Sequence, residues 1–225
     1  MRKIDPADVR GGFSNEASEL LAYFERIRPN LAGDPHEKAD TSQLASMVFL
    51  DLYVGFERFL SDLFLAYLNR DFSLYQQDLD GRIQQSVESR FSPWAAERIS
   101  FDPVDHVKVD ELESIIDSDG WNLTFKNADA IVKKATDWLV PAYATRITSL
   151  TSADMRLIDT ARAVRDFIAH QSKGAKRRMN EKLESISHGG GNKGLSRGTQ
   201  NINVVGETLR RRSMASAVSE FMQTA

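Results

Sequence analysis

Apolar residues recur at intervals of three and four over about 41–69, and this periodicity is what most constrains the fold. Such a pattern predicts an amphipathic helix, and the wide apolar face predicts that the helix is the central element of the core. Asp40, with Gln43 three residues later, resembles a capping pair that starts it. The stripe consists of Leu44, Val48, Leu52, Phe56, Phe59, Leu60, Leu63 and Tyr67, widened by Phe49, Tyr53 and Phe64.

The helical period continues along most of the chain, with breaks expected near Gly81 and Pro93. Pro141 is expected to end one helix, and Thr151 with Asp154 forms a capping pair at the start of another. The chain is therefore expected to be all-α, with irregular insertions and a C-terminal helix. The predicted helical segments are 14–28, one or two helices within 74–99, and about 109–117, 126–139, 152–172, 175–187 and 207–223.

The length of 225 residues suggests a single domain over 1–225, with a flexible glycine-rich loop at 188–198 and a short strand at 203–205. The chain contains no cysteine, which excludes disulfides and thiolate metal sites. No run of 18 apolar residues suggests a membrane span, and the charged N-terminus does not resemble a secretory signal. We therefore expect a cytoplasmic protein without a membrane partner.

The charged residues are unevenly distributed along the chain. Residues 1–155 carry 16 Lys and Arg against 26 Asp and Glu, whereas residues 156–212 carry 13 against 5. A basic region on an acidic chain suggests a polyanionic partner such as nucleic acid. A solvated surface whose charges compensate one another would give the same counts.

Four histidines are present, and no two of them lie at the spacing of one helix face. The chain also lacks an HExxH motif or a comparable ligand set. We therefore expect no metal and no cofactor.

Residues 165–170 read Arg-Asp-Phe-Ile-Ala-His, near the end of the predicted 152–172 helix. Asp166 and His170 share a helix face, whereas Arg165 and His170 differ by about 140° on an ideal helix. Either Arg165 reaches around the helix, or the helix deforms, or a second copy completes the site. Two-fold pairing would bring two His170 and two Arg165 into one cleft, which is a physical reason to expect a homodimer.

The segment 164–170, Val-Arg-Asp-Phe-Ile-Ala-His, with the basic residues after it, resembles the signature of the HEPN superfamily: Arg, four to six residues, then His. The upstream helix carries the pattern aromatic-Glu-x-aromatic, Phe-Glu-Arg-Phe at 56–59. With this pattern the chain resembles the prokaryotic HEPN proteins of toxin and defence systems. The resemblance covers about 40–185 and implies a HEPN-like helical bundle. It also implies a metal-independent endoribonuclease that acts as a homodimer, often as a toxin restrained by an antitoxin protein.

Under this resemblance His170 is the general base or acid, Arg165 stabilises the charged phosphorane, and Asp166 positions the pair. The implied products are a 2′,3′-cyclic phosphate and a 5′-OH. Glu57 has a supporting role at the cleft. Lys173, Lys176, Arg177 and Arg178 would hold the RNA backbone electrostatically.

Each of these residues also has an ordinary structural interpretation. A histidine near a helix C-terminus interacts favourably with the helix dipole, and Asp166 is a normal partner for a residue one turn away. Glu57 beside an apolar stripe would usually be paired, and a basic first turn is usually solvated. The alternative function is therefore a non-catalytic helical module that binds RNA or a protein.

Overall fold

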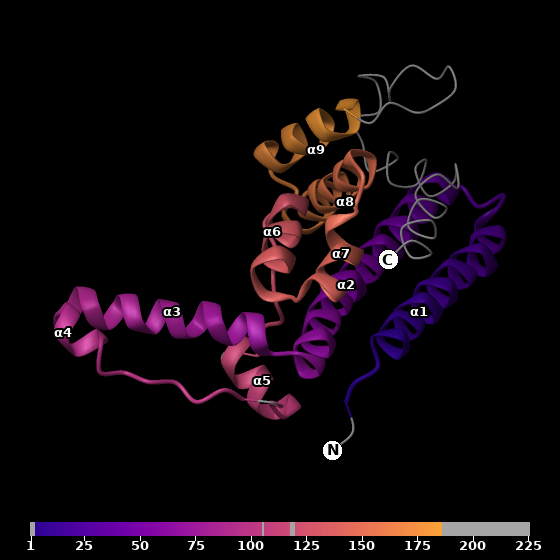
Figure 1. Cartoon of the computed structure of the whole chain (residues 1–225). Helices are drawn as coiled ribbons and strands as arrows, with labels where there is room; N and C mark the ends of the chain where they lie inside the picture. The colour runs from indigo at the N-terminus through magenta and orange to yellow at the C-terminus, as the bar shows by residue number, and fades with distance from the viewer. Residues whose placement is uncertain (1–2, 105, 118–119, 186–225) are drawn as a thin grey trace. The chain divides into compact units, whose positions relative to one another are not determined.

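The computed structural model describes residues 3–104, 106–117 and 120–185 of the chain. These residues form nine α-helices and one short 3₁₀ helix, with no strand among them, so the all-α prediction is confirmed for this part (Figure 1). The HEPN-like arrangement of the helices stays a prediction. The elements are α1 (Pro6–Ile27), η1 (Arg28–Leu31), α2 (Glu37–Arg70), α3 (Ser73–Arg90), α4 (Pro93–Ala96), α5 (Val109–Ile116), α6 (Ala128–Trp138), α7 (Pro141–Thr148), α8 (Ser152–His170) and α9 (Lys173–Ser185).

The first two helices begin earlier than predicted, and an Asp-Pro pair lies at or just before the start of each. The Asp5 carboxylate accepts a hydrogen bond from Ala7 N at 2.9 Å, and Pro6 is the first residue of α1. The Asp34 carboxylate likewise accepts from His36 N at 2.7 Å, just before α2. The predicted capping pair was wrong, because Asp40 already lies in the first turn of α2.

The helix breaks predicted at glycine and proline in the middle of the chain differ from those in the structure. Helix α3 continues through Gly81 and ends at Arg90, so the break expected at this glycine was wrong. Pro93 begins α4, where the Ser92 hydroxyl accepts from Ala95 N at 3.3 Å. Pro141 follows the end of α6 but also occupies the first position of α7, a helix that we did not predict.

The predicted capping box at the start of α8 is confirmed. Asp154 N donates to the Thr151 hydroxyl at 3.2 Å, and Thr151 N donates to the Asp154 carboxylate at 2.8 Å. The helix ends at His170 because Gln171 adopts a left-handed conformation with a φ of 48°. The Ser172 hydroxyl then accepts from Ala175 N and starts α9 two residues before the predicted 175.

The chain divides into two compact units. Unit 1 comprises Met1–Val9, Leu60–Phe125 and Asp129–Ser149, and unit 2 comprises Arg10–Phe59, Lys126–Ala128 and Leu150–Ala225, of which the structure describes the residues up to 185. The expectation of a single domain stays a prediction. The loop at 188–198, the strand at 203–205 and the helix at 207–223 lie outside the described residues.

Each unit has its own apolar core. In unit 1 the Phe64 ring contacts Phe125 and Trp138, and the rings of Tyr67 and Tyr143 stack at 4.9 Å. In unit 2 the core joins α1, the first half of α2, α8 and α9. Its buried members are Phe24, Ala45, Val48, Phe49, Tyr53, Val164, Phe167, Ala175, Met179 and Leu183. None of the described helices has the length and apolarity of a membrane span.

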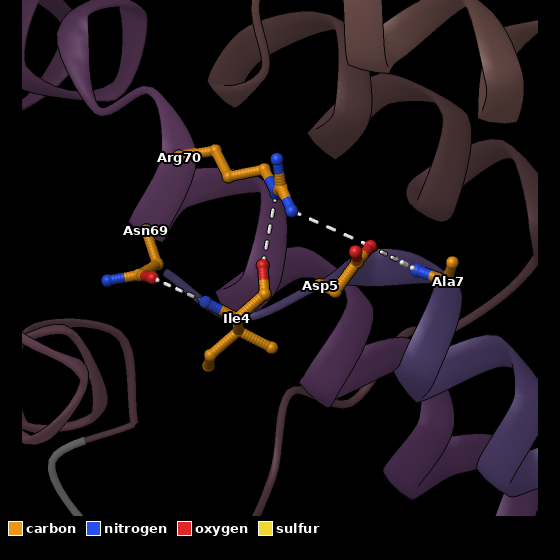
Figure 2. Close-up of polar contacts among 5 residues, drawn as sticks. All are labelled: Ile4, Asp5, Ala7, Asn69 and Arg70. Carbon is orange, nitrogen blue, oxygen red and sulfur yellow. Dashed lines mark hydrogen bonds and ion pairs between the residues drawn. The ribbon is translucent and has the colours of Figure 1, made fainter. Parts of the chain in front are cut away.

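A buried asparagine at the end of α2 connects three segments of unit 1. The Asn69 side chain accepts from Ile4 N at 3.0 Å and donates to Val107 O at 2.9 Å. Figure 2 shows how the next residue, Arg70, donates to Ile4 O and pairs with the Asp5 carboxylate. The N-terminal segment is thus fixed to the end of the predicted central helix.

We predict that Asn69→Ala lowers the free energy of unfolding by about 2–4 kcal/mol, because it leaves two backbone groups without their partner in a buried place. Urea unfolding followed by circular dichroism measures the change. Asn30→Ala is the control, since the Asn30 side chain donates to Arg26 O at an exposed position. This substitution should lower the free energy of unfolding by less than about 0.5 kcal/mol. Equal effects of the two substitutions would contradict this role.

Candidate active site

A cluster of three charged side chains at the edge of the unit 2 core is centred on Arg165 of α8. Its Nη2 donates to Glu57 of α2 at 3.0 Å, and its Nη1 donates to Asp166 at 3.0 Å. The three side chains are only partly exposed: 28% for Arg165, 21% for Glu57 and 22% for Asp166. Three sequence-predicted site residues therefore meet in one network that links α2 to α8.

Burial and charge act against each other on the Arg165 guanidinium. Burial lowers its pKa, but the adjacent carboxylates of Glu57 and Asp166 outweigh burial, and the net shift of the pKa is upward. Arg165 is therefore a permanent cation. Its guanidinium has five N–H donors, and these two bonds occupy two of its nitrogens.

An aromatic ring from α2 lies beneath the guanidinium. The Arg165 Cζ lies 5.7 Å from the centroid of the Tyr53 ring, within the range of a cation–π contact. Tyr53 is buried, and burial first, then the charge of Glu57, raises the pKa of its hydroxyl to about 12. Tyr53 is thus a neutral hydrogen-bonding group near neutral pH and not a base.

The local sequence explains why these groups meet. Tyr53 and Glu57 are one turn apart on α2, so they face the same neighbour. On α8, Val164 and Phe167 are buried in the core of unit 2 and set the rotation of the helix. Arg165 follows a core residue directly, which places its side chain at the edge of the core, facing α2.

A second arginine, Arg162, lies one turn before Arg165 on α8 and influences the pKa of Tyr53. It is half-buried, and its Nη1 is buried without a hydrogen-bond partner among the described residues. Neither Tyr53 nor Arg162 was predicted to belong to the site, and Tyr53 was expected only to widen the apolar stripe of the central helix. The available signal was the spacing of four that joins Tyr53 to Glu57 and Arg162 to Asp166.

His170 lies apart from this network. It is the last residue of α8, it is exposed, and no hydrogen bond or ion pair of its side chain is found among the described residues. Asp166, which shares a helix face with His170, is bonded to Arg165 instead. The structure therefore brings together Arg165, Asp166 and Glu57, and it leaves the imidazole open to solvent five residues away.

The basic residues of α9 follow His170 closely. Lys173, Arg177 and Arg178 are exposed, and Lys176 is half-buried. Arg177 has an exposed partner, with its Nε 3.7 Å from the Glu181 carboxylate. In the part of the chain that the structure describes, no group of three His, Asp or Glu residues could hold a metal ion.

We predict that Tyr53 makes stability fall at alkaline pH. The unfolded chain releases the tyrosine proton near pH 10, whereas the folded chain holds it to about pH 12, so rising pH favours unfolding between these values. Between pH 9 and 11 the free energy of unfolding should fall by about 1 kcal/mol more in the wild type than in Tyr53→Phe. Urea unfolding at both pH values tests this, and parallel declines in the two proteins would refute it.

The chain matches no protein-family model, no curated protein and no solved structure.

Proposed function

We propose that this chain is a metal-independent endoribonuclease that acts as a homodimer. The observation that supports it best is the Arg165 guanidinium, which Glu57 and Asp166 hold on α8 five residues before the exposed imidazole of His170. A fixed cation and an open imidazole at one helix end are the two kinds of group that RNA cleavage needs. RNA is the substrate, and the basic residues of α9 hold its backbone.

The reaction needs a base, an acid and a cation. A His170 imidazole takes the proton of the 2′-OH, and the 2′-oxygen attacks phosphorus to form a phosphorane. Arg165 stabilises the added negative charge with its remaining N–H donors. A second imidazole gives its proton to the leaving 5′-oxygen as the P–O bond breaks. The products are a 2′,3′-cyclic phosphate and a 5′-OH.

The need for two imidazoles is the reason for the homodimer. One chain offers a single histidine at the site, and base and acid must act on opposite sides of the same phosphorus. Two-fold pairing of α8 with the α8 of a second copy supplies the second His170 and the second Arg165. Arg165 and His170 of one chain lie on different faces of α8. In a dimer, Arg165 of one copy can instead act together with His170 of the other copy.

The two carboxylates beside Arg165 affect its proposed role, stabilisation of the phosphorane, in opposite ways. Glu57 and Asp166 fix the guanidinium, so little reorganisation is needed when the phosphorane forms. They also offset its charge, and this observation favours the second candidate, a non-catalytic module that binds RNA or a protein.

A toxin or defence role in the cytoplasm, with an antitoxin protein as partner, extends the first candidate and follows the HEPN resemblance alone.

We predict that the purified protein cleaves RNA in the presence of EDTA and leaves 2′,3′-cyclic phosphate ends. His170→Ala and Arg165→Ala should each slow cleavage at least about 100-fold. His36→Ala is the matched control, because His36 is also exposed but lies in the turn before α2. Gel analysis of labelled RNA and identification of the product ends provide the readout.

Cleavage that is the same in His170→Ala and wild type would overturn the site assignment, because a copurified nuclease would behave in this way. RNA binding without cleavage, at equal affinity in wild type and His170→Ala, would favour the binding module. Size measurement of the same sample must show a dimer, since an active monomer would contradict the need for a second copy.

A further inference from the structure

Two large aromatic side chains are exposed where α3 meets α4. Phe91 is 75% exposed and Trp94 is 64% exposed. Most of residues 82–90, in the second half of α3, are exposed as well. Ile83 is exposed and Val87 is half-buried, and their spacing of four places them on the helix face that leads to Phe91. Figure 1 shows α4 beside the outer end of α3. Two large aromatic side chains exposed so close together in the sequence are a candidate binding surface.

Trp94 is held in a defined geometry. The Arg98 guanidinium carbon lies 3.7 Å from the centroid of the Trp94 ring, and its Nη1 donates to Trp94 O at 3.0 Å. The Ser92 hydroxyl caps α4, which sets the backbone that carries both residues. Trp94 and Arg98 thus form a preformed pair of stacked planar side chains. We call this pair, together with the exposed Phe91 three residues before Trp94, the aromatic tip.

The charge around the aromatic tip differs from that of the rest of unit 1. Residues 81–100 contain three arginines and two glutamates. The flanking residues 60–80 contain one basic and four acidic residues, and residues 101–125 contain one basic and seven acidic residues. Arg82 is paired with Asp78, and Glu88 and Glu97 balance Arg90 and Arg98, so the tip is close to neutral whereas the flanking segments are acidic. A polyanion is therefore repelled less at the tip than by the flanking segments.

We propose that the aromatic tip is a stacking platform for the unpaired bases of single-stranded RNA. This inference rests on the proposed function and names its substrate class as single-stranded and not double-stranded RNA. Every base has a flat face that stacks on an aromatic ring or on a guanidinium plane, and these faces are covered in a duplex. Arg98 additionally brings a positive charge close to the RNA backbone.

A peptide partner is the other ligand that exposed aromatic residues suggest. It would need an apolar surface continuous enough to exclude water, whereas Arg98 lies on the Trp94 ring, and the neighbouring residues in the sequence, Arg90 and Glu97, are charged and exposed. An exposed ring stacked with an exposed guanidinium fits the flat face of a base beside a phosphate better.

The test measures binding separately from cleavage, with His170→Ala as the background protein. Fluorescence anisotropy gives the Kd for a labelled 12-nucleotide oligouridine and for an RNA duplex. The length of about 12 nucleotides lies within the site size of one single-strand-binding module. We expect Phe91→Ala and Trp94→Ala each to weaken oligouridine binding about 10-fold and to leave the weaker duplex binding unchanged. Trp121→Ala is the matched control, because Trp121 is 80% exposed but follows an acidic segment.

Oligouridine binding that Phe91→Ala and Trp94→Ala leave unchanged would overturn the inference, and so would equal binding of oligouridine and duplex. The same substitutions with His170 intact separate this result from the proposed function. Unchanged binding together with wild-type cleavage in EDTA would refute the aromatic tip alone. If Phe91→Ala and Trp94→Ala weaken oligouridine binding but the wild-type protein does not cleave RNA, the nuclease is refuted and the tip is supported.

Discussion

The ion pair between Glu57 and Arg165 is the contact on which the proposed site depends. It connects α2 to α8 at the edge of the unit 2 core, and a second carboxylate, from Asp166, holds the same guanidinium. A partly buried cation needs such partners, because desolvation without compensation would cost several kcal/mol. The pair therefore does two things at once: it permits an arginine beside the core, and it determines where that arginine points.

The helices of this chain could be predicted well from the sequence, and their ends less well. The apolar period over 41–69 led directly to α2, and the pair of Thr151 and Asp154 marked the start of α8. The errors arose where a residue type has two local roles. Pro141 both stops α6 and starts α7, and a left-handed Gln171 ends α8 at His170, before the predicted 172.

The site could be predicted only in part, because helix spacing does not say which neighbour a side chain meets. The sequence placed Asp166 with His170 on one face, but Asp166 bonds to Arg165, its immediate neighbour, since Glu57 of α2 draws the guanidinium to that side. Tyr53 beneath the guanidinium follows from the packing of α2 against α8, which a single sequence does not specify. The exposure of His170 agrees with its place at a helix end.

A double-mutant cycle between positions 57 and 165 tests the central interaction most directly. Urea unfolding of Glu57→Ala, Arg165→Ala and the double variant gives the coupling free energy. We expect about 1 kcal/mol, and clearly less for the matched cycle between Glu16 and Arg58, a pair of 2.6 Å whose side chains are more exposed. A coupling between 57 and 165 no larger than that of the exposed pair would contradict the account, because Arg165 would then not be held where the site needs it.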